Sequence, residues 1–361
     1  MNNKIKNNID ELYLMMKDLS NYNGLLGPGS YWLDNQKLII KWLKKNDLNF
    51  FLKYDRLNKS LSNFGGGSRW RSVIEIDEEI QDTYNNKLFL LSQKLKISKI
   101  SNYYKYKLRD LSREKYILKL LIKYLIIHCK DKDTDNELNK IESSLIGNPS
   151  DLISINNKLY TSKFLDEFLK YLDIKKYVNF EKINNFLEIG PGAGIFSEVL
   201  AKLFINLKIY LIDIPPQLYV TQSYLSAVFP NQVATYSMIK KDPSILNSQN
   251  FRIFIIAPWQ FETINFGELD FAFNQVSFSE MKKETAKSYL AILSNRNTKI
   301  INIRSVEKNK IKEGPSFSDY EKILVNYNIV GKDLISADFK EKENKIRTSI
   351  SAYYKNKKFF K

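Results

Sequence analysis

The sequence predicts a mainly α-helical region over residues 1–145, followed by an α/β domain over residues 146–361 with a mostly parallel sheet. Three observations support this fold class. Before residue 150, apolar residues recur at helical spacing; after it, short β-rich runs alternate with helical patterns. One of these runs leads into a glycine-rich turn, which is typical of a ligand-binding α/β domain. The charged and polar stretch 130–148 is the expected junction.

The first region contains five segments with helical periodicity, at residues 9–19, 36–42, 80–95, 104–111 and 116–128. We expect these helices to cover the mouth of a site on the second domain, and they are a candidate surface for homodimerisation. A glycine-rich loop between two of them contains Trp70, flanked by Arg69 and Arg71. Because guanidinium groups bind phosphate strongly, the two arginines are candidate contacts for an anionic substrate. A solvated loop packed on the second domain is the alternative.

The second domain contains seven β-rich runs, at residues 185–189, 208–214, 252–257, 269–274, 299–304, 329–339 and 345–354. Helical patterns separate most of the runs, which favours a doubly wound, seven-stranded sheet. In such a sheet, ligands bind at the carboxyl ends of the strands. Residues that follow the runs are therefore the candidates for a functional site.

Composition excludes several classes of protein. Hydrophobic residues make up 43% of the chain, which argues against disorder. The only cysteine, Cys129, rules out an intramolecular disulfide and a multi-cysteine metal site. No run approaches the ~18 apolar residues of a membrane span, and the N-terminus lacks the apolar core of a secretory signal. We therefore expect no membrane span and a cytoplasmic location.

The net charge of +16 has two interpretations. It can attract an anionic partner, such as a nucleic acid or a small substrate that carries phosphate. It can also reflect a composition biased toward Lys, Asn and Ile. The lysines are scattered and form no basic block, which argues against a nucleic-acid partner and leaves an acidic small substrate open.

A short apolar run leads into the turn Gly190-Pro191-Gly192-Ala193-Gly194, and a helical pattern follows. Glycines at alternate positions let the backbone turn sharply and let a ligand approach where a Cβ would collide. The dinucleotide fingerprint G-x-G-x-x-G would place its third glycine at Ile195 or Ser197, so it does not match. Instead, Glu188 stands two residues before the first glycine, in the form E-x-G-x-G-x-G.

This form resembles the first motif of class I methyltransferases, which have a Rossmann-like fold. The resemblance implies S-adenosylmethionine as the cofactor, bound by Glu188, Gly190, Pro191, Gly192 and Gly194. The acid suits a ligand with an amino group and a sulfonium, whereas it would repel a pyrophosphate. Asp213 and Ile214 end the next strand, 19 residues or more beyond Gly194, where a carboxylate can accept hydrogen bonds from two ribose hydroxyls. The alternative is a tight loop without a ligand, with Asp213 capping a helix.

Later strand ends supply the other candidates. The segment after run 269–274 should face the transferred methyl group and contains Asn274, Gln275, Ser277 and Glu280, of which Asn274 and Gln275 are also expected cofactor contacts. Trp259 and Gln260 end the preceding strand, where they are expected to flank the adenine; a core position is the alternative for Trp259. Arg304 ends the next strand and is a candidate for binding an anionic part of the substrate or for pairing with a carboxylate.

A hydroxyl acceptor must lose its proton, which requires a base or a metal-activated oxygen. The only histidine, His128, lies in a helical segment of the first region, and we interpret it as a core or interface residue. Glu280 is therefore the leading catalytic base, with Asn274 and Ser277 as further catalytic candidates. A helix-start carboxylate is the alternative for Glu280. A divalent ion held by Glu280 and Asn274 is conceivable, but the ligand spacing does not indicate one.

Most of the chain resembles a bacterial family of sugar O-methyltransferases. The matching segments are 30–32, 146–149, 187–194, 211–215, 224–225, 229–230 and 273–281. In the last segment, the residues that match the family pattern are Asn274, Ser277, Phe278, Glu280 and Met281, whereas Gln275 and Ser279 depart from it. The resemblance implies a sugar hydroxyl as the acceptor, in a sugar, a nucleotide-linked sugar or a glycosylated small molecule.

Two other functions remain open from the sequence. Residues 188–192 also resemble the ribosomal RNA adenine dimethylases, which would make the chain a nucleic-acid methyltransferase. Those enzymes have a proline in the motif that holds a flipped base, and the corresponding segment 274–278 has none. Their extra domain also follows the catalytic domain, whereas here it precedes it. The second alternative is a non-catalytic scaffold that binds S-adenosylmethionine, which the lack of a histidine base keeps open.

Overall fold

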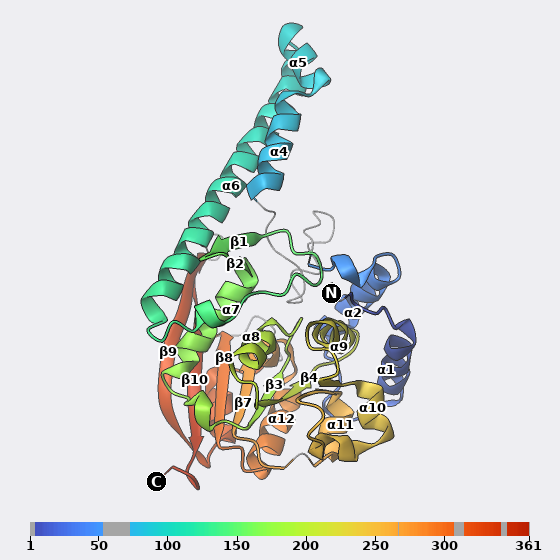
Figure 1. Ribbon diagram of the computed structural model, residues 1–361, viewed down its shortest axis with the longest axis vertical. Helices are drawn as coiled ribbons and strands as arrows, with labels where there is room; N and C mark the ends of the chain where they lie inside the picture. The colour runs from blue at the N-terminus through green and yellow to red at the C-terminus, as the bar shows by residue number, and fades with distance from the viewer. Residues whose placement is uncertain (1–3, 53–72, 266, 307–313, 341–344, 361) are drawn as a thin grey trace.

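An eight-stranded sheet forms the centre of the molecule, with the strand order β5-β6-β4-β3-β7-β8-β10-β9 (Figure 1). The computed structural model describes residues 4–52, 73–265, 267–306, 314–340 and 345–360. The strands are β3 (Asn185–Ile189), β4 (Lys208–Ile212), β5 (Val233–Ala234), β6 (Ile253–Ile256), β7 (Phe271–Gln275), β8 (Ile300–Val306), β9 (Tyr327–Lys340) and β10 (Lys345–Asn356). The first six strands of this order, from β5 through β6, β4, β3 and β7 to β8, are parallel to their neighbours. Strand β10 pairs antiparallel with both β8 and β9. The order reverses between β3 and β7, which creates a crevice at their carboxyl ends.

All seven predicted runs form strands of this sheet, so the predicted Rossmann-like, mostly parallel fold is confirmed. The eighth strand, β5, has two residues, too few to leave a pattern in the sequence. The run predicted over 208–214 ends early, at Ile212, so Asp213 and Ile214 lie in the loop that follows β4. Both residues therefore lie at the edge of the sheet, where their side chains can reach a ligand.

Helices cover both faces of the sheet. They are α7 (Ser162–Lys175), α8 (Ile195–Leu203), α9 (Gln217–Val228), α10 (Tyr236–Lys241), α11 (Pro258–Thr263), α12 (Lys283–Asn295) and α13 (Phe317–Ile323). Phe186 of β3 shares a hydrophobic core with α7, α8 and α9, while the next residue, Leu187, shares another with α11, α12 and α13. Successive side chains of a strand point to opposite faces, so a strand buried on both faces reads as a continuous apolar run.

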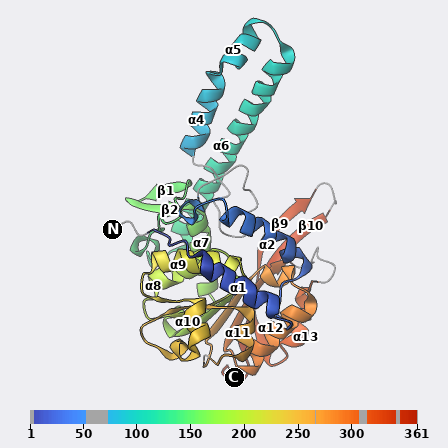
Figure 2. The ribbon, with the colours of Figure 1, turned by 90° about the vertical axis from the view of Figure 1, so that its right-hand side faces the viewer.

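The first part of the N-terminal region packs directly on the α/β domain. Helices α1 (Ile9–Asn21) and α2 (Ser30–Leu43), with the 3₁₀ turn η1 (Leu48–Phe50), lie beside α9 and α10 (Figure 2). Met15 of α1 and Ile39 of α2 are buried in the same core as α7 to α9. These two helices are therefore packed as part of the α/β-domain core, and the domain boundary at residue 145 stays a prediction.

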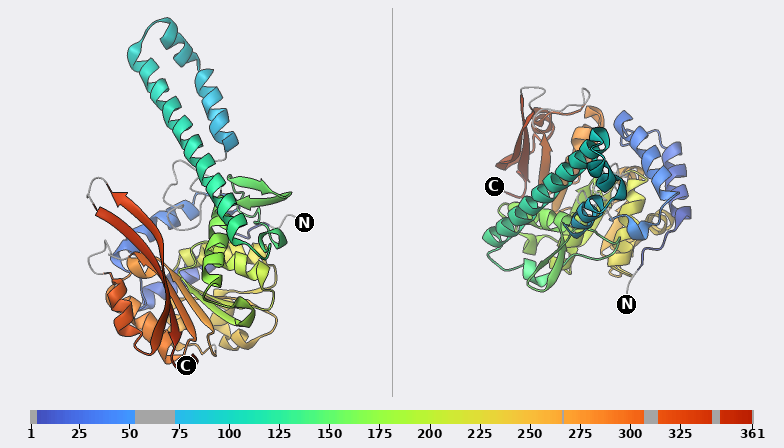
Figure 3. Two further views of the ribbon diagram at one scale, coloured as in Figure 1. Left: turned by 90° about the vertical axis from the view of Figure 1, so that its left-hand side faces the viewer. Right: turned by 90° about the horizontal axis from the view of Figure 1, so that it is seen from above.

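The second part of this region is a helical hairpin that projects from the α/β domain (Figure 3). It consists of α4 (Val73–Tyr84), α5 (Lys87–Lys94) and the long α6 (Ser98–Lys132). The two helices predicted over 104–111 and 116–128 are parts of α6, because the polar residues between them continue the helix. His128 is half-buried on α6, with its ring centroid 4.1 Å from that of Tyr124.

The single helix predicted over 80–95 is instead divided between α4 and α5. Asn86 begins the second helix because its side chain accepts hydrogen bonds from the backbone of Leu88 and Phe89. Among the described helices, none has the length and apolar character needed to cross a membrane.

The segment between the hairpin and the α/β domain includes short elements that the sequence did not predict. It contains η3 (Leu138–Lys140) and a small antiparallel sheet of β1 (Leu152–Ile155) and β2 (Lys158–Thr161). Two further 3₁₀ turns, η4 (Phe180–Lys182) and η5 (Pro243–Asn247), lie within the α/β domain. Strand β2 ends at Thr161, directly before α7, and α7 contributes to the cavity beside the crevice between β3 and β7.

Candidate active site

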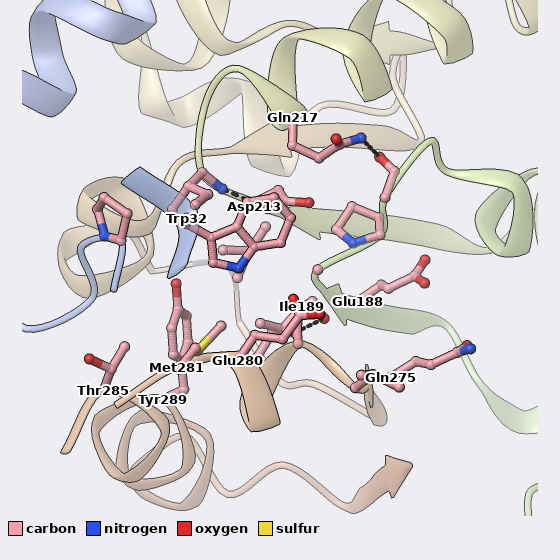
Figure 4. Close-up of a pocket in the computed structure, with 18 of the residues that line it drawn as sticks. Trp32, Glu188, Ile189, Asp213, Gln217, Gln275, Glu280, Met281, Thr285 and Tyr289 are labelled. Carbon is pink, nitrogen blue, oxygen red and sulfur yellow. Dashed lines mark hydrogen bonds between the residues drawn. The ribbon is translucent and has the colours of Figure 1, made fainter. Parts of the chain in front are cut away.

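A cavity of about 250 Å³ lies at the carboxyl edge of the sheet, beside the reversal between β3 and β7. The turn after β3, the loop after β4, the 3₁₀ turn η6 (Ser277–Glu280) and helices α7 and α12 contribute to its lining. Residues from the N-terminal segment 26–32 complete it (Figure 4). Because ligands of open α/β sheets bind in this crevice, the cavity is the candidate active site.

The glycine turn after β3 forms one wall of the cavity. Gly190, Gly192 and Gly194 have φ angles of 76°, 60° and 83°, in the region that residues with a side chain rarely adopt. A Cβ on Gly190 would also lie 2.5 Å from the Oγ of Ser277. The Gly192 carbonyl accepts a hydrogen bond from Gln217 Nε2 at 2.7 Å, which fixes the turn. The turn therefore presents bare backbone to the cavity, as the sequence predicted.

Glu188 lies at one end of the cavity, next to Gln275 (Figure 4). Its side chain is 4% exposed and accepts a hydrogen bond from Ser197 Oγ of α8 at 2.5 Å. Burial raises the pKa of Glu188 to about 7, because leaving water costs the ionised form more than the neutral form. A cationic group in the cavity would offset that cost, so the site favours a positively charged ligand.

Asp213 lies on the cavity wall at the end of β4. Burial raises its pKa to about 8, although its Oδ1 accepts a hydrogen bond from the Ile214 backbone at 2.8 Å and the nearby Glu280 adds to the shift. The Gly192 backbone also donates a hydrogen bond to the Asp213 carboxyl group, and a carboxylate can accept further hydrogen bonds from hydroxyl donors, as the ribose hypothesis requires. Ile214 lines the cavity beside it.

Glu280 is the third carboxyl group of the cavity, and it comes from η6. Burial raises its pKa to about 7, while a hydrogen bond from the Trp32 side chain acts in the opposite direction. Trp32 belongs to α2, more than two hundred residues earlier in the chain. The sequence predicted Glu280 as a site residue but gave no indication that an N-terminal tryptophan would contact it.

Asn274 is buried behind the cavity and does not line it. Its Nδ2 donates to the Ile189 carbonyl at 3.0 Å and to Ser277 Oγ, and its Oδ1 accepts from the Phe278 backbone at 3.2 Å. Ser277 Oγ also donates to the Ile189 carbonyl, at 3.2 Å. The amide thus ties β3 to η6 and positions the turn that carries Glu280, which differs from the direct contact expected for it.

The N-terminal segment is held over the cavity by hydrogen bonds to both sides. Gln36 Nε2 donates to the Pro215 carbonyl at 2.7 Å, and Thr285 Oγ1 donates to the Leu25 carbonyl at 2.9 Å. Leu26 is 1% exposed and packs in the core of α11 to α13. Of the helices expected to cover the mouth of the site, α2 contributes Trp32 to the cavity lining, whereas α4 to α6 project away from the α/β domain (Figure 3). The covering role of the N-terminal region stays a prediction.

Helix α7 adds two charged residues to the cavity that the sequence analysis missed. Lys163 and Glu167 line it and form an ion pair of 2.6 Å, and Glu167 also pairs with the buried Lys170. Burial opposes the ionised form of Glu167, but Lys163 and Lys170 together hold its pKa at about 2. The available signal was a set of opposite charges spaced three and four residues apart on this helix.

Three other predicted site residues lie away from the cavity. Trp259 Nε1 donates to Tyr236 Oη at 3.1 Å, and its ring contacts Tyr22, so it occupies the core position named as its alternative. Gln260 Oε1 accepts a hydrogen bond from the Ala257 backbone at 2.9 Å, which caps the N-terminus of α11. Arg304 is 6% exposed and does not line the cavity, and β8 continues beyond it to Val306, so it does not end the strand as predicted.

The predicted residues that line the cavity are Glu188, Gly190, Pro191, Gly192, Asp213, Ile214, Gln275, Ser277 and Glu280. Gly194 precedes α8 as its N-cap residue. Arg69 and Arg71 lie outside the described residues. Within the described ranges, no group of three or more His, Cys, Asp or Glu side chains is arranged to hold a metal ion.

No protein-family model and no curated protein matches the sequence. Solved structures of methyltransferases are similar to part of it. One is magnesium protoporphyrin IX methyltransferase from Synechocystis with bound S-adenosylmethionine, at 14% identity over 63% of this chain and 95% of that one, with a TM-score of 0.34. Another is mitomycin 7-O-methyltransferase, at 12% identity over 54% of this chain and 57% of that one, with a TM-score of 0.35. Neither similarity bears on the substrate of this chain.

Proposed function

We propose that the chain is an S-adenosylmethionine-dependent O-methyltransferase. The observation that carries the proposal is the pair of buried carboxyl groups, Glu188 and Asp213, on either side of a glycine turn in one cavity. Both have pKa values raised by burial, so both gain from a ligand that supplies positive charge or hydroxyl donors. The amino group and sulfonium of S-adenosylmethionine supply the charge, and its ribose supplies the hydroxyls.

The donor set of the cavity fits this cofactor from end to end. Glu188 would accept from the amino group, and Asp213 would accept from the ribose hydroxyls. Lys163, at the same end as Glu188, would pair with the carboxylate of the amino-acid part. Gly190 and Gly192 have positive φ angles, and a Cβ on Gly190 would collide with the Ser277 side chain, so the close approach of the turn to η6 depends on glycine. When bound, the cofactor supplies an electrophilic methyl group.

The residues opposite the glycine turn would then serve the acceptor. A carboxyl group whose pKa is about 7 can take a proton from a hydroxyl near neutral pH, and Glu280 meets that condition. Trp32 would fix the orientation of the carboxylate through their hydrogen bond. The segment 26–32 excludes water from this side of the cavity, and the close packing orients the acceptor for in-line transfer.

We propose a sugar hydroxyl as the acceptor, in a sugar, a nucleotide-linked sugar or a glycosylated small molecule. Two features support this substrate class: the sequence resemblance to sugar O-methyltransferases, and the net charge of +16, which favours an acceptor that carries phosphate. Polar side chains such as Gln275 and Thr285 in the lining offer hydrogen bonds to neighbouring hydroxyls.

Two measurements test the proposal. Calorimetry of the purified chain should show binding of S-adenosylmethionine and of its demethylated product, with no comparable binding of NAD. Incubation with a panel of nucleotide sugars and free sugars should then release the demethylated product with at least one acceptor. Binding without turnover on any acceptor would favour the non-catalytic scaffold, and binding of NAD alone would overturn the proposal.

A further inference from the structure

The outer face of α6 carries a regular apolar stripe. The stripe follows the heptad spacing of helices that pair along their length, with alternating intervals of three and four residues. Its positions are 103, 106, 110, 113, 117, 120, 124 and 127. Six of these positions are apolar: Tyr103, Tyr106, Ile117, Leu120, Tyr124 and Ile127. Their side chains are between 39% and 64% exposed. We call these eight positions the outer stripe.

The opposite face of α6 already has its partners. Leu111 and Leu118 are buried against Ile76 of α4, and Leu125 and Cys129 are buried in the core beside α7. The helix therefore has two heptad faces, of which the inner one is satisfied within the chain. The hairpin does not need the outer stripe for its own packing, so the stripe is suited to a contact outside it.

Two opposite charges stand in the middle of the outer stripe, Asp110 and Arg113. Both are exposed, and neither belongs to the two ion pairs that join α6 to α4 in the described hairpin, Lys107 with Glu79 and Lys115 with Asp77. A polar pair within an apolar seam costs stability but selects one alignment of the partners. The two charges therefore restrict which helix can pack on the stripe, and in which direction.

We propose that two copies of the chain associate through the outer stripe, with the two α6 helices antiparallel. When Asp110 is set opposite Arg113 of the second copy, the same alignment places Tyr103 opposite Leu120 and Tyr106 opposite Ile117. Twofold symmetry repeats each of these contacts, so one surface is complementary to itself. A parallel alignment would instead set Asp110 against Asp110 and Arg113 against Arg113, which like-charge repulsion opposes.

The antiparallel alignment also covers the apolar tip of the hairpin. Exposed apolar side chains gather there, at Leu88, Leu90, Leu91, Leu95, Ile97 and Ile100. In the proposed dimer, the tip of one copy lies at the base of α6 in the other, where Tyr124 and Ile127 are exposed. The paired length from residue 99 to residue 124 is about 40 Å at the rise of an α-helix. A second copy thus accounts for both exposed apolar features of the hairpin.

Charge reversal on the full chain tests the proposal through sedimentation velocity at micromolar concentration. The unchanged chain should be a dimer. Asp110→Arg and Arg113→Asp should each weaken the dimer by about tenfold or more, because each sets like charges against each other twice. The double variant with both changes restores complementarity and should dimerise like the original. Leu334→Ser is the control: Leu334 lies on β9 and is as exposed as the apolar residues of the outer stripe, so this change should leave the dimer intact.

A spin label at Lys99→Cys measures the direction of the helices. In the antiparallel dimer the two labels are separated by roughly 37 Å along the axis, whereas a parallel pair would bring them within ~10 Å. The native Cys129 is buried and should not react under native conditions. A short distance, a monomeric chain, or a dimer that ignores both charge reversals would overturn the proposal. A monomer that cosediments with anionic phospholipid vesicles would assign the stripe and tip to a membrane surface instead.

Discussion

The two sides of the candidate active site are built in different ways. The cofactor side, with Glu188, the glycine turn and Asp213, comes from one continuous β-α-β segment. The acceptor side combines η6 with the N-terminal segment 26–32, and Gly29 lies against the Glu280 carbonyl. A ligand common to many proteins can be recognised by local backbone geometry, whereas a pocket for a particular acceptor needs residues from distant parts of the chain. The two sides should therefore respond differently to substitution.

The largest effect is expected on the acceptor side. Glu280→Gln removes the base but keeps the size of the side chain, so kcat should fall by about 10² to 10³-fold. The dissociation constant of the demethylated cofactor, measured by calorimetry, should change little. Glu284→Gln is the matched control, because Glu284 is an exposed carboxylate in the first turn of α12. If Glu280→Gln retained full kcat, the assignment of the base would be wrong and the comparison of the two sides would lose its basis.

On the cofactor side, Asp213→Ala should weaken binding of the demethylated cofactor by roughly 10- to 100-fold, the range expected when hydrogen bonds to a charged group are lost. At saturating cofactor, kcat should stay within about twofold, because the residue binds the ribose and not the reacting atoms. Asp34→Ala on the exposed face of α2 is the control. A large loss of kcat without a loss of affinity would place Asp213 on the acceptor side instead.

The pH dependence of binding separates the charged cofactor from its product. Burial raises the pKa of Glu188 to about 7 and that of Asp213 to about 8, so affinity for the cationic cofactor should increase as pH rises through this window. The demethylated product lacks the sulfonium charge, and its affinity should increase less. Calorimetry at several pH values measures both, and Glu188→Gln should flatten both profiles. Equal slopes for the two ligands would mean that the carboxyl groups do not sense the sulfonium.

The same shifts affect the stability of the ligand-free chain in the opposite direction. The folded pKa values exceed the unfolded ones, near ~4, so the folded state holds more protons than the unfolded state between pH ~4 and pH ~8. These groups therefore contribute most stability at low pH, and their contribution is lost as pH rises through the folded pKa values. Cofactor binding should restore the loss, so the ligand-induced rise in melting temperature should be larger at pH 8 than at pH 6.

The sequence indicated which residues would meet at the glycine turn because their constraints are local. A glycine in the left-handed region, an acid two residues before it and a strand that ends at Ile212, directly before Asp213, all leave their pattern in adjacent residues. The strands of the parallel sheet were recognisable for the same reason, since burial on both faces gives continuous apolar runs. Helix boundaries were less accurate in the hairpin, where Asn86 caps α5 in the middle of a periodic segment.

The sequence could not predict contacts that depend on tertiary packing. Nothing local to Trp32 indicates that it will reach Glu280, and nothing local to Trp259 separates an adenine contact from its observed packing against Tyr22. Lys163 precedes the glycine turn by a whole helix and strand, yet lies at the same end of the cavity. Such residues become candidates only when the fold brings them together.

The smallest expected effect concerns Asn274, which connects the two sides. Asn274→Ala removes one of the two side-chain donors to the Ile189 carbonyl and the acceptor of the Phe278 amide, so it should lower the free energy of unfolding by about 1–3 kcal/mol. The loss of kcat should be moderate and should accompany the loss of stability, because η6 and Glu280 would be less firmly positioned. Gln275→Ala is the control for stability alone: that side chain lines the cavity and belongs to no hydrogen bond between described residues, so the free energy of unfolding should change little. A drop in kcat with an unchanged free energy of unfolding would instead make Asn274 a direct contact of the substrate. The acceptor side would then begin at the end of β7 and not at η6.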